Sequence, residues 1–218
     1  ASDVYKRQEQ VEVIKGPASV LYGRGSSGGL INRITKKPGI DKNEVMLQVG
    51  SWNQRRGEFD FARNDEESGI AFRITGALEG ANSYRDQQFL DRQALSPSLL
   101  IKLSSDTKLL LQADYLSDRR VTDFGIPAYH GLPVNVPVGT YYGAANARNF
   151  DYSQSRVTSF GFTLDHRFND VWSIRNAFRH YNYSLDRNNT LVGSVNEAAQ
   201  TVSLTRSNVR REEDGYFN

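Results

Sequence analysis

A glycine spacing at residues 23–28 is the first pattern in this chain that could support chemistry. Gly23-Arg24-Gly25-Ser26-Ser27-Gly28 satisfies G-x-G-x-x-G, which in dinucleotide-binding proteins cradles a pyrophosphate at the N-terminus of a helix. The residues that follow, Leu30 to Thr35, are partly β-branched and soon meet Pro38, so they favour a strand over a helix. Gly29 also stands where a P-loop requires lysine. A nucleotide-binding enzyme therefore remains only a remote alternative.

The histidines give no sign of a metal site. His130, His166 and His180 are far apart in the sequence and lack the close spacing of zinc ligands, such as H-E-x-x-H. We therefore expect no catalytic residue, no metal ligand provided by the protein and no enzyme activity.

The glycines lie between two short segments with strand character. Val11–Ile14 is apolar at alternate positions and ends at Lys15-Gly16-Pro17, where proline fixes φ and donates no ladder hydrogen bond. The loop from Gly23 to Gly29 then leads into the second segment, Leu30–Thr35. Four glycines in this loop indicate positive φ or a close approach of the backbone.

This stretch resembles the end of the plug domain of TonB-dependent outer-membrane receptors, in their siderophore-receptor branch and especially the receptors of ferric hydroxamates. In that family a strand ends in a basic residue and Gly-Pro, a Tyr-Gly turn follows, and a Gly-Gly pair opens a strand that ends in Lys/Arg-Pro. The corresponding residues here are Lys15-Gly16-Pro17, Tyr22-Gly23, Gly28-Gly29, Asn32 and Lys37-Pro38. The match is long, and it is more specific than the G-x-G-x-x-G spacing that it contains.

The composition is compatible with this resemblance. The 218 residues carry 27 basic and 25 acidic side chains, a net charge of +2, so no strong field favours nucleic acid as a partner. The chain has no cysteine and no apolar run long enough for a spanning helix. Its mean hydropathy of −0.58 does not exclude a membrane, because strands of membrane barrels alternate apolar and polar residues.

From Val45 onward, apolar residues recur at every second position. Phe72 and Ile74 alternate with Arg73 and Thr75, and the same pattern is repeated around Leu109, Leu111 and Phe160, Phe162. A period of two is typical of strands with two different faces. Aromatic residues near the expected strand ends could form the interfacial girdles of a barrel or pack within the sheet; they are Trp52, Tyr115, Phe168, Trp172, Tyr181 and Tyr183.

The links between these segments alternate in length. Short turns are expected at 64–69, 104–106 and 169–170, and long links at 80–92, 117–155 and about 186–196. Barrels of the outer membrane have short periplasmic turns and long extracellular loops, and the alternation matches this asymmetry. The first expected outer link, 51–56, is the exception because it is short.

We therefore expect an all-β fold, in which the end of a plug domain precedes antiparallel strands of an incomplete transmembrane β-barrel. Residues 9–40 would be the C-terminal part of the plug, and 41–218 the N-terminal part of the barrel, with about eight strands. The resemblance implies a complete barrel of about 22 strands. Residues 1–8 have no counterpart in the family's pattern, and a non-native origin is one interpretation of them.

The resemblance also implies a function. Receptors of this family bind a ferric siderophore outside the cell and import it when the TonB complex pulls on the plug through a more N-terminal segment, which this sequence does not show. Iron would arrive inside the siderophore, so no cofactor is expected. The other expected partner is outer-membrane lipid, with no nucleic acid. A receptor of the same class for another solute, such as a cobalamin or a glycan, is the main alternative.

Candidate ligand-binding residues are aromatic, since aromatic faces and a few polar groups suit the organic shell of a siderophore. They lie in the two long links that come first in the chain: Tyr84, Phe89, Phe124, Tyr129, Tyr141 and Tyr142. The alternative is that such residues form the small core that a loop of this length needs. Lys15 and Arg24 are the candidate contacts between plug and barrel. Lys15 matches the basic residue before Gly-Pro, while Arg24 occupies a more variable position.

Overall fold

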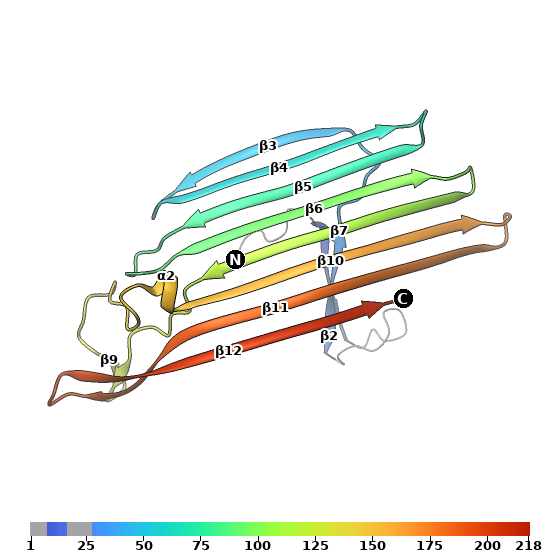
Figure 1. Ribbon diagram of the computed structural model, residues 1–218. Helices are drawn as coiled ribbons and strands as arrows, with labels where there is room; N and C mark the ends of the chain where they lie inside the picture. Colours follow the sequence, from blue (N-terminus) through green and yellow to red (C-terminus); the bar gives the residue numbers. More distant parts are fainter. Residues whose placement is uncertain (1–7, 17–27) are drawn as a thin grey trace.

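The computed structural model describes residues 8–16 and 28–218, most of which lie in one antiparallel sheet. Its eight strands are ordered β12-β11-β10-β7-β6-β5-β4-β3, and Figure 1 shows them side by side. They are β3 (Lys42–Gly50), β4 (Gln54–Asp65), β5 (Ile70–Ala81), β6 (Leu90–Lys102), β7 (Thr107–Arg120), β10 (Tyr152–Arg167), β11 (Ser173–Asn196) and β12 (Thr201–Phe217). The sheet is not closed, because β3 and β12 are its two edges. The expected all-β fold with an incomplete barrel wall is confirmed.

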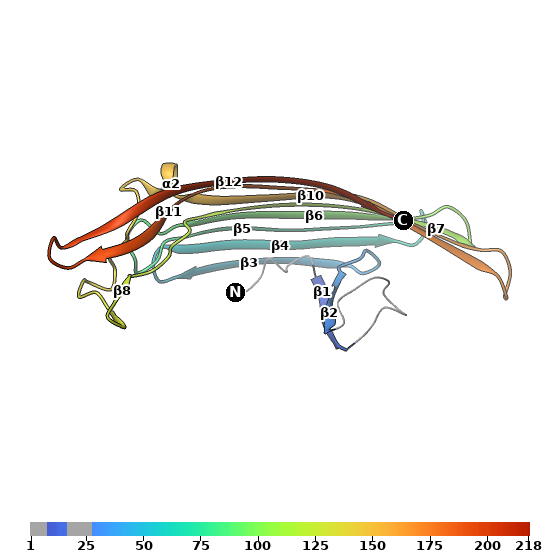
Figure 2. The same cartoon turned by 90° about the horizontal axis from the view of Figure 1, so that it is seen from below.

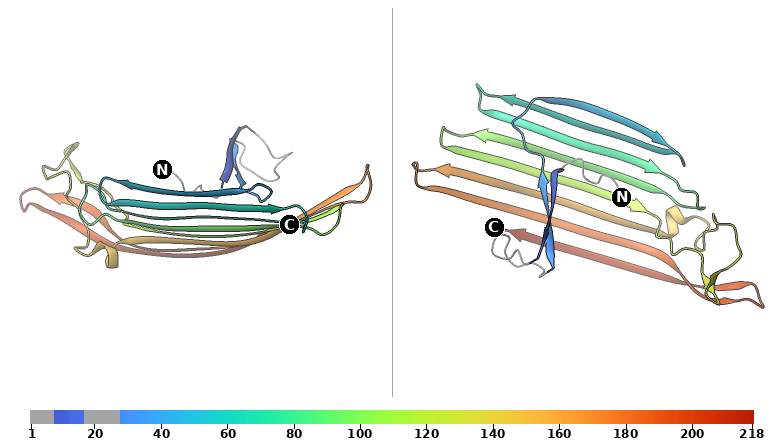
Figure 3. Two further views of the ribbon diagram at one scale, coloured as in Figure 1. Left: turned by 90° about the horizontal axis from the view of Figure 1, so that it is seen from above. Right: turned by 180° about the vertical axis from the view of Figure 1, so that it is seen from behind.

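The smaller elements lie on the two faces of this curved sheet. β1 (Gln8–Lys15) and β2 (Gly29–Thr35) form a separate antiparallel pair on the concave side, as Figures 2 and 3 show. β8 (Ala128–Tyr129) and β9 (Leu132–Pro133) also lie on the concave side, whereas α2 (Ala147–Phe150) lies on the convex side (Figures 2 and 3). β2 is the strand expected after the glycine loop, so the helix that a dinucleotide site requires is not formed there.

The two faces of the sheet have the polarity opposite to that of a soluble sheet. On the convex face Leu47 is 82 % exposed and Leu78 is 63 % exposed. On the concave face Asp60 is 0 % exposed and Arg73 is 4 % exposed. Apolar side chains on the outside and charges on the inside are the arrangement of a membrane barrel, in which lipid replaces water against the outer face.

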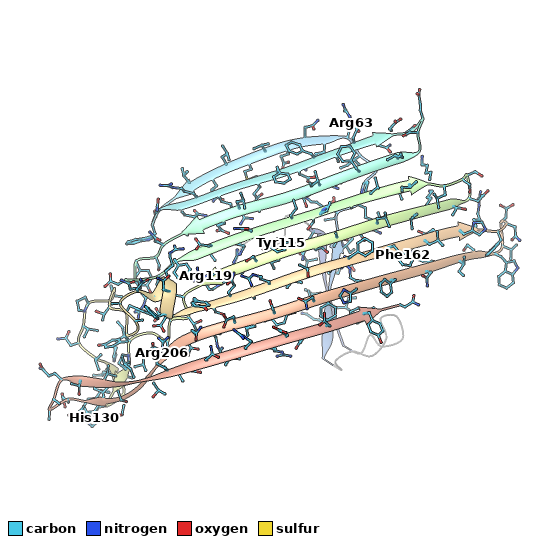
Figure 4. The ribbon with its side chains drawn as sticks, in the orientation of Figure 1. Arg63, Tyr115, Arg119, His130, Phe162 and Arg206 are labelled. Carbon is cyan, nitrogen blue, oxygen red and sulfur yellow. The ribbon has the colours of Figure 1, made fainter. Side chains whose placement is uncertain are left out.

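The apolar stripe on the convex face runs obliquely across the strands. On β3 the stripe includes Leu47. The residue of β10 that lies level with Leu47 in the sheet register is Arg156. The apolar residues of β10, Phe160 and Phe162, lie four and six residues beyond Arg156, toward the turn end of the sheet. Figure 4 labels Phe162 and Tyr115 on this face. Strands of a barrel tilt, so a band level with the membrane must shift along the strands from one to the next. The oblique course of this stripe is the one expected for the apolar band of a tilted barrel wall.

The two ends of the sheet differ as expected. Short turns at 66–69, 103–106 and 168–172 lie at one end, which we call the turn end. The links at 51–53, 82–89, 121–151 and 197–200 lie at the other, the loop end, and we number them loops 1 to 4. One expectation was wrong, because residues 186–196 are strand and the loop is only 197–200. The pairing of β11 with β12 continues past the rest of the sheet, through β-forming residues such as Thr190 and Val192.

The aromatic girdle is only partly confirmed. Trp52 lies exposed in loop 1, and Phe168 and Trp172 lie exposed in the turn 168–172. Tyr183 pairs with Val157 in a row that belongs to the concave face, and Tyr181 shares that face, so neither lies on the apolar convex face. Among the residues described, none of the helical structure has the length and apolar character needed to cross a membrane.

Candidate functional site

Loops 2 and 3 fold together into one unit at the loop end. Arg85 of loop 2 is 9 % exposed, forms an ion pair with Asp123 and donates to the carbonyl of Val138 at 3.2 Å. The backbone N–H of Asp86 donates to the carbonyl of Gly139 at 2.8 Å. Arg85 therefore ties two distant parts of loop 3 to loop 2. The two loops therefore present a single surface.

This unit has its own small apolar core. Phe89, Val121 and Ala147 are buried together, and Tyr141 and Tyr152 pack against them. The guanidinium of Arg148 lies 4.1 Å from the centre of the Phe89 ring, a cation–π contact. The interpretation that some loop aromatics form a core is correct for Phe89. Its ring, at 6 % exposed, supports the loop fold.

Asp151 anchors the end of loop 3 to the long β11–β12 hairpin. Its carboxylate is 0 % exposed and accepts hydrogen bonds from the Tyr141 hydroxyl at 2.8 Å and the Ala144 N–H at 2.6 Å. It also accepts from the Thr190 hydroxyl at 2.8 Å and pairs with Arg206 at 2.5 Å. Figure 4 shows Arg206 on β12 beside the loops. One buried carboxylate thus joins loop 3, β11 and β12.

These contacts set the protonation of both partners, which lie in the loop and outside the membrane-spanning strands. Burial alone would raise the pKa of the Asp151 carboxyl, but the bonds from Ala144, Tyr141 and Thr190 and the charge of Arg206 outweigh it and lower that pKa. Burial, and then the bond to Asp151, raise the pKa of the Tyr141 hydroxyl. Asp151 is therefore ionised and Tyr141 protonated at neutral pH.

The other predicted ligand residues keep part of their rings accessible. Tyr84 is 53 % exposed and lies edge-to-face with Trp52, with ring centres 6.4 Å apart. Phe124 is 51 % exposed. Tyr129 and Tyr142 line a groove of about 630 Å³ between loop 3 and the β11–β12 tip. The structure thus brings two of the six predicted residues, Tyr129 and Tyr142, to one cavity, places Phe89 and Tyr141 in or against the loop core, and leaves Tyr84 and Phe124 exposed elsewhere in the loops.

The concave wall below the loops carries a ladder of ion pairs across four strands. Arg56 on β4 contacts Glu79 on β5 at 2.7 Å, and Glu79 contacts Arg92 on β6 at 3.1 Å. Arg92 in turn contacts Asp118 on β7 at 2.7 Å, and Asp118 also accepts from Arg120 at 2.5 Å. Opposite charges alternate along this row, so charge inside the wall is compensated locally.

The β1–β2 pair and the segment after it contact the wall through a second charged cluster. Lys36 lies 2.7 Å from the carboxylate of Asp60, which is fully buried on β4. Arg73 on β5 binds the same carboxylate at 2.9 Å, donates to the carbonyl of Lys37 at 3.2 Å and reaches Glu9 on β1 at 3.4 Å. Arg73 therefore bridges the wall, the linker and β1.

These contacts involve different basic residues from the two predicted. Within the described residues the structure gives Lys15 no ion pair, and its side chain is exposed, so its role stays a prediction. Arg24 lies outside the described residues. Sequence reasoning missed Lys36, although it stands beside the Lys37-Pro38 signal. It also missed Asp151, whose partners Thr190 and Arg206 are 39 and 55 residues away.

Comparisons with known proteins agree with this architecture. No protein-family model matches the chain. The metal-pseudopaline receptor CntO of Pseudomonas aeruginosa is 34 % identical over 180 residues, covering 82 % of this chain and 25 % of the receptor. The ferrioxamine B receptor of Salmonella typhimurium is 35 % identical over 206 residues, covering 88 % of this chain and 28 % of the receptor.

Solved structures show the same fold. The crystal structure of the ferric-catecholate import receptor Fiu from Escherichia coli K12 superimposes with a TM-score of 0.76 and 26 % identity. That match covers 96 % of this chain and 32 % of the receptor. The chain spans about a quarter of the length of the curated relatives it matches. On sequence and fold together, the chain belongs to the TonB-dependent siderophore receptors of the outer membrane.

Proposed function

We propose that this chain is part of a receptor that captures a ferric siderophore at the loop end and imports it by TonB-coupled transport. The observation that carries this proposal is the placement of β1–β2 on the concave face of a sheet whose convex face exposes apolar side chains, with a folded loop unit at one end (Figure 2). Iron is the cargo within its chelate, so the protein needs no cofactor to hold it.

The division of the chain follows from the same arrangement. We assign residues 9–40 to the end of the plug and residues 41–218 to the first part of the barrel. The support is that β1 and β2 pair only with each other, whereas β3 begins the continuous sheet. The contacts of Lys36 and Arg73 with Asp60 would keep the plug's end on the wall while the TonB complex acts on a more N-terminal segment. Lipid would cover the apolar stripe.

Four of the predicted aromatic residues are suited to contact the ligand. Tyr84, Phe124, Tyr129 and Tyr142 have accessible rings, and aromatic faces pack well against the organic shell of a chelate. Phe89 and Tyr141 would affect ligand binding indirectly, because they stabilise the fold of the loop unit.

Growth under iron limitation tests the proposal. A strain that lacks this receptor is supplied with single ferric siderophores and complemented with the full-length gene. We expect the gene to restore growth and uptake of labelled iron on at least one chelate, and to fail when the TonB protein is deleted.

The test also addresses the alternative within the class. Failure of every ferric chelate, together with TonB-dependent uptake of a cobalamin or a glycan, would contradict the proposal. The same wall and plug would then serve a different solute.

A further inference from the structure

The convex face carries arginines along the loop-end border of the apolar stripe. On three strands an arginine stands four residues from an aromatic residue of the stripe, on its loop-end side. The pairs are Arg55 and Phe59 on β4, Arg119 and Tyr115 on β7, and Arg156 and Phe160 on β10. Residues four apart on a strand share a face, so all three arginines lie on the convex face. The stripe shifts along the strands, and the arginines shift with it.

Two of these arginines form a cluster with Arg148, and we call Arg119, Arg148 and Arg156 the arginine cluster. Arg148 belongs to α2, on the convex side of the sheet, and its backbone carbonyl accepts from the Arg119 guanidinium at 2.5 Å. Arg119 is the cross-strand partner of Gln154. Arg156, two residues further along β10, is therefore its diagonal neighbour, at a Cα distance of about 7–8 Å. Figure 4 labels Arg119 beside the loops.

The positive charge of this cluster is only partly compensated. Arg148 pairs with Asp91, the one acid that the described strands from β3 to β10 place on the convex face at the loop-end side of the stripe. Within the described part of the chain, Arg119 and Arg156 form no ion pair. The Nε of Arg119 is buried and has no hydrogen-bond partner among the described residues. Three guanidinium groups beside one carboxylate leave an excess of positive charge that a bound anion would neutralise.

This excess is confined to one part of the convex face. On β11 and β12 the same face carries acids beside its arginines, and these residues are Asp186, Glu212, Asp214, Arg206 and Arg210. Their charges balance within one unit and with the acids in excess. The uncompensated cations are thus the arginine cluster and, further along the border, Arg55.

The position of the cluster indicates the kind of anion. Guanidinium groups bind phosphate oxygens in a bidentate manner. The stripe next to the cluster offers exposed apolar surface, including Tyr115 and Phe160. A phosphorylated lipid carries its phosphate at the boundary between acyl chains and water, so it matches both surfaces at once. A free phosphate would gain nothing from the stripe. The long loops of such barrels lie outside the cell, so the lipid belongs to the outer leaflet.

We propose that the arginine cluster binds the phosphate group of an outer-leaflet lipid, whose acyl chains cover the adjoining part of the apolar stripe. Arg156 is exposed and has no competing partner in the described structure. Arg119 and Arg148 are already held in place, since their guanidinium groups lie 4.7 Å from the ring of Tyr152 and 4.1 Å from the ring of Phe89. Because Arg148 lies in α2, the bound lipid also fastens the end of loop 3 to the outside of the wall.

The test uses the full-length receptor, freed of lipid in a nonionic detergent, and three probes. These are lipid A with two phosphates, the same glycolipid without phosphates, and inorganic phosphate. Native mass spectrometry counts the bound lipid and gives its dissociation constant. We expect the phosphorylated glycolipid to bind at least about tenfold more tightly than the form without phosphates, and inorganic phosphate to show no saturable binding. Amide hydrogen exchange of residues 147–150 should slow when the phosphorylated form is bound.

Three variants test the role of the guanidinium group. Arg156→Gln should weaken binding of the phosphorylated glycolipid by about five- to tenfold. Arg156→Lys should weaken it by only about two- to threefold, because an ammonium keeps the charge but loses the fork. Arg63→Gln is the matched control and should change no affinity. Arg63 is exposed on the same face, four residues from Phe59 on the turn-end side of the stripe.

Thermal unfolding separates binding from folding. Arg156 is exposed and unpaired in the described structure, so Arg156→Gln should unfold at the wild-type temperature without lipid and gain less stability when the phosphorylated glycolipid is added. Equal affinity for the two glycolipids overturns the inference. Binding of inorganic phosphate as tight as that of the lipid would show a site for free anions and also overturns it. So does an equal loss of affinity in Arg156→Gln and Arg63→Gln.

Discussion

At the scale of single residues, Asp151 links more elements of the loop end than its position in the sequence suggests. It accepts from three loop and strand donors and pairs with Arg206 while fully buried. Hydrogen bonds to a charged group are worth about 1.5–3 kcal/mol each, and buried donors left without a partner are costly. This carboxylate therefore contributes strongly to the packing of loop 3 on β11 and β12, alongside the bond from Arg206 to the carbonyl of Phe150.

Replacement of Asp151 by asparagine should loosen loop 3 without unfolding the wall. The amide keeps the size of the side chain but loses its charge toward Arg206, so we expect local opening of residues 141–151 to become easier by about 2 kcal/mol. Amide hydrogen exchange of the full-length receptor measures this. Asp86→Asn, an exposed aspartate in loop 2, is the control, and equal effects of the two substitutions would refute the role of Asp151.

The lowered pKa of Asp151 also predicts how loop 3 responds to pH. A carboxyl whose folded pKa lies below its ordinary value of 3.8 stabilises the fold above that value, and the contribution is lost as the pH falls through the folded pKa. Protection of residues 141–151, corrected for intrinsic exchange, should be constant from about pH 8 to 5 and fall only below about pH 4. In the Asp151→Asn variant that acid-dependent fall should disappear. A fall already complete at pH 5 would contradict this prediction.

At the scale of elements, the strands from β3 to β10 have an apolar convex face and a more polar concave face, and the two faces should respond differently to substitution. Phe162 on β10 lies within the apolar stripe, whereas Gln154 lies on the same face of the same strand nearer the loop end. Phe162→Arg should destabilise the full-length receptor by about 2–4 kcal/mol, because it places a charge in lipid, and Gln154→Arg by about 0–1 kcal/mol. Unfolding in lipid vesicles compares them, and equal costs would mean that the stripe is not the lipid band.

The charged face contains the ladder of ion pairs, in which Arg92 joins Glu79 to Asp118. Removing one partner of a buried pair typically costs about 3–5 kcal/mol. Arg56 and Arg120 still compensate the two acids, so Arg92→Met should cost about 3 kcal/mol, at the lower end of that range. Thermal unfolding of the full-length receptor is the measurement.

Arg63→Met provides the comparison for this substitution. Arg63 is exposed on β4 and meets Asp41 only at 3.8 Å, so its loss should cost less than about 1 kcal/mol. If the two arginines proved equally costly, burial in the ladder would not be the cause.

At the scale of the whole molecule, the open sheet is the dominant feature. The backbone groups on the outer sides of β3 and β12 have no neighbouring strand in the described structure. A membrane does not tolerate unpaired edges, and closure into a barrel removes them. We therefore expect residues 1–218, expressed alone, not to show cooperative, reversible unfolding as a monomer in detergent. Such unfolding, detected by circular dichroism, would contradict the expectation.

The sequence alone indicated the all-β fold, the apolar face of the strands from β3 to β10 and the resemblance to the family, but it gave no apolar face for β11. Alternation along β5 or β10 is a local property, because successive side chains of a strand point to opposite faces. The glycine stretch before Pro38 was equally informative, since β2 follows it as expected. Strand ends were less certain. The extent of β11 depends on its pairing with β12, so residues 186–196 appeared to be a loop.

Only the tertiary structure decided which side chains meet. Lys36 pairs with Asp60, at a separation of 24 residues in the sequence. Asp151 contacts Thr190 and Arg206 at still greater separations. These contacts form because the sheet register brings distant strands side by side. The tertiary structure also decided which loop aromatics are accessible, burying Phe89 and bringing Tyr129 and Tyr142 to the groove between loop 3 and the β11–β12 tip. Alternation within a strand carries no information about partners on other strands or loops. Those partners follow from register and loop packing, which exist only in the folded chain.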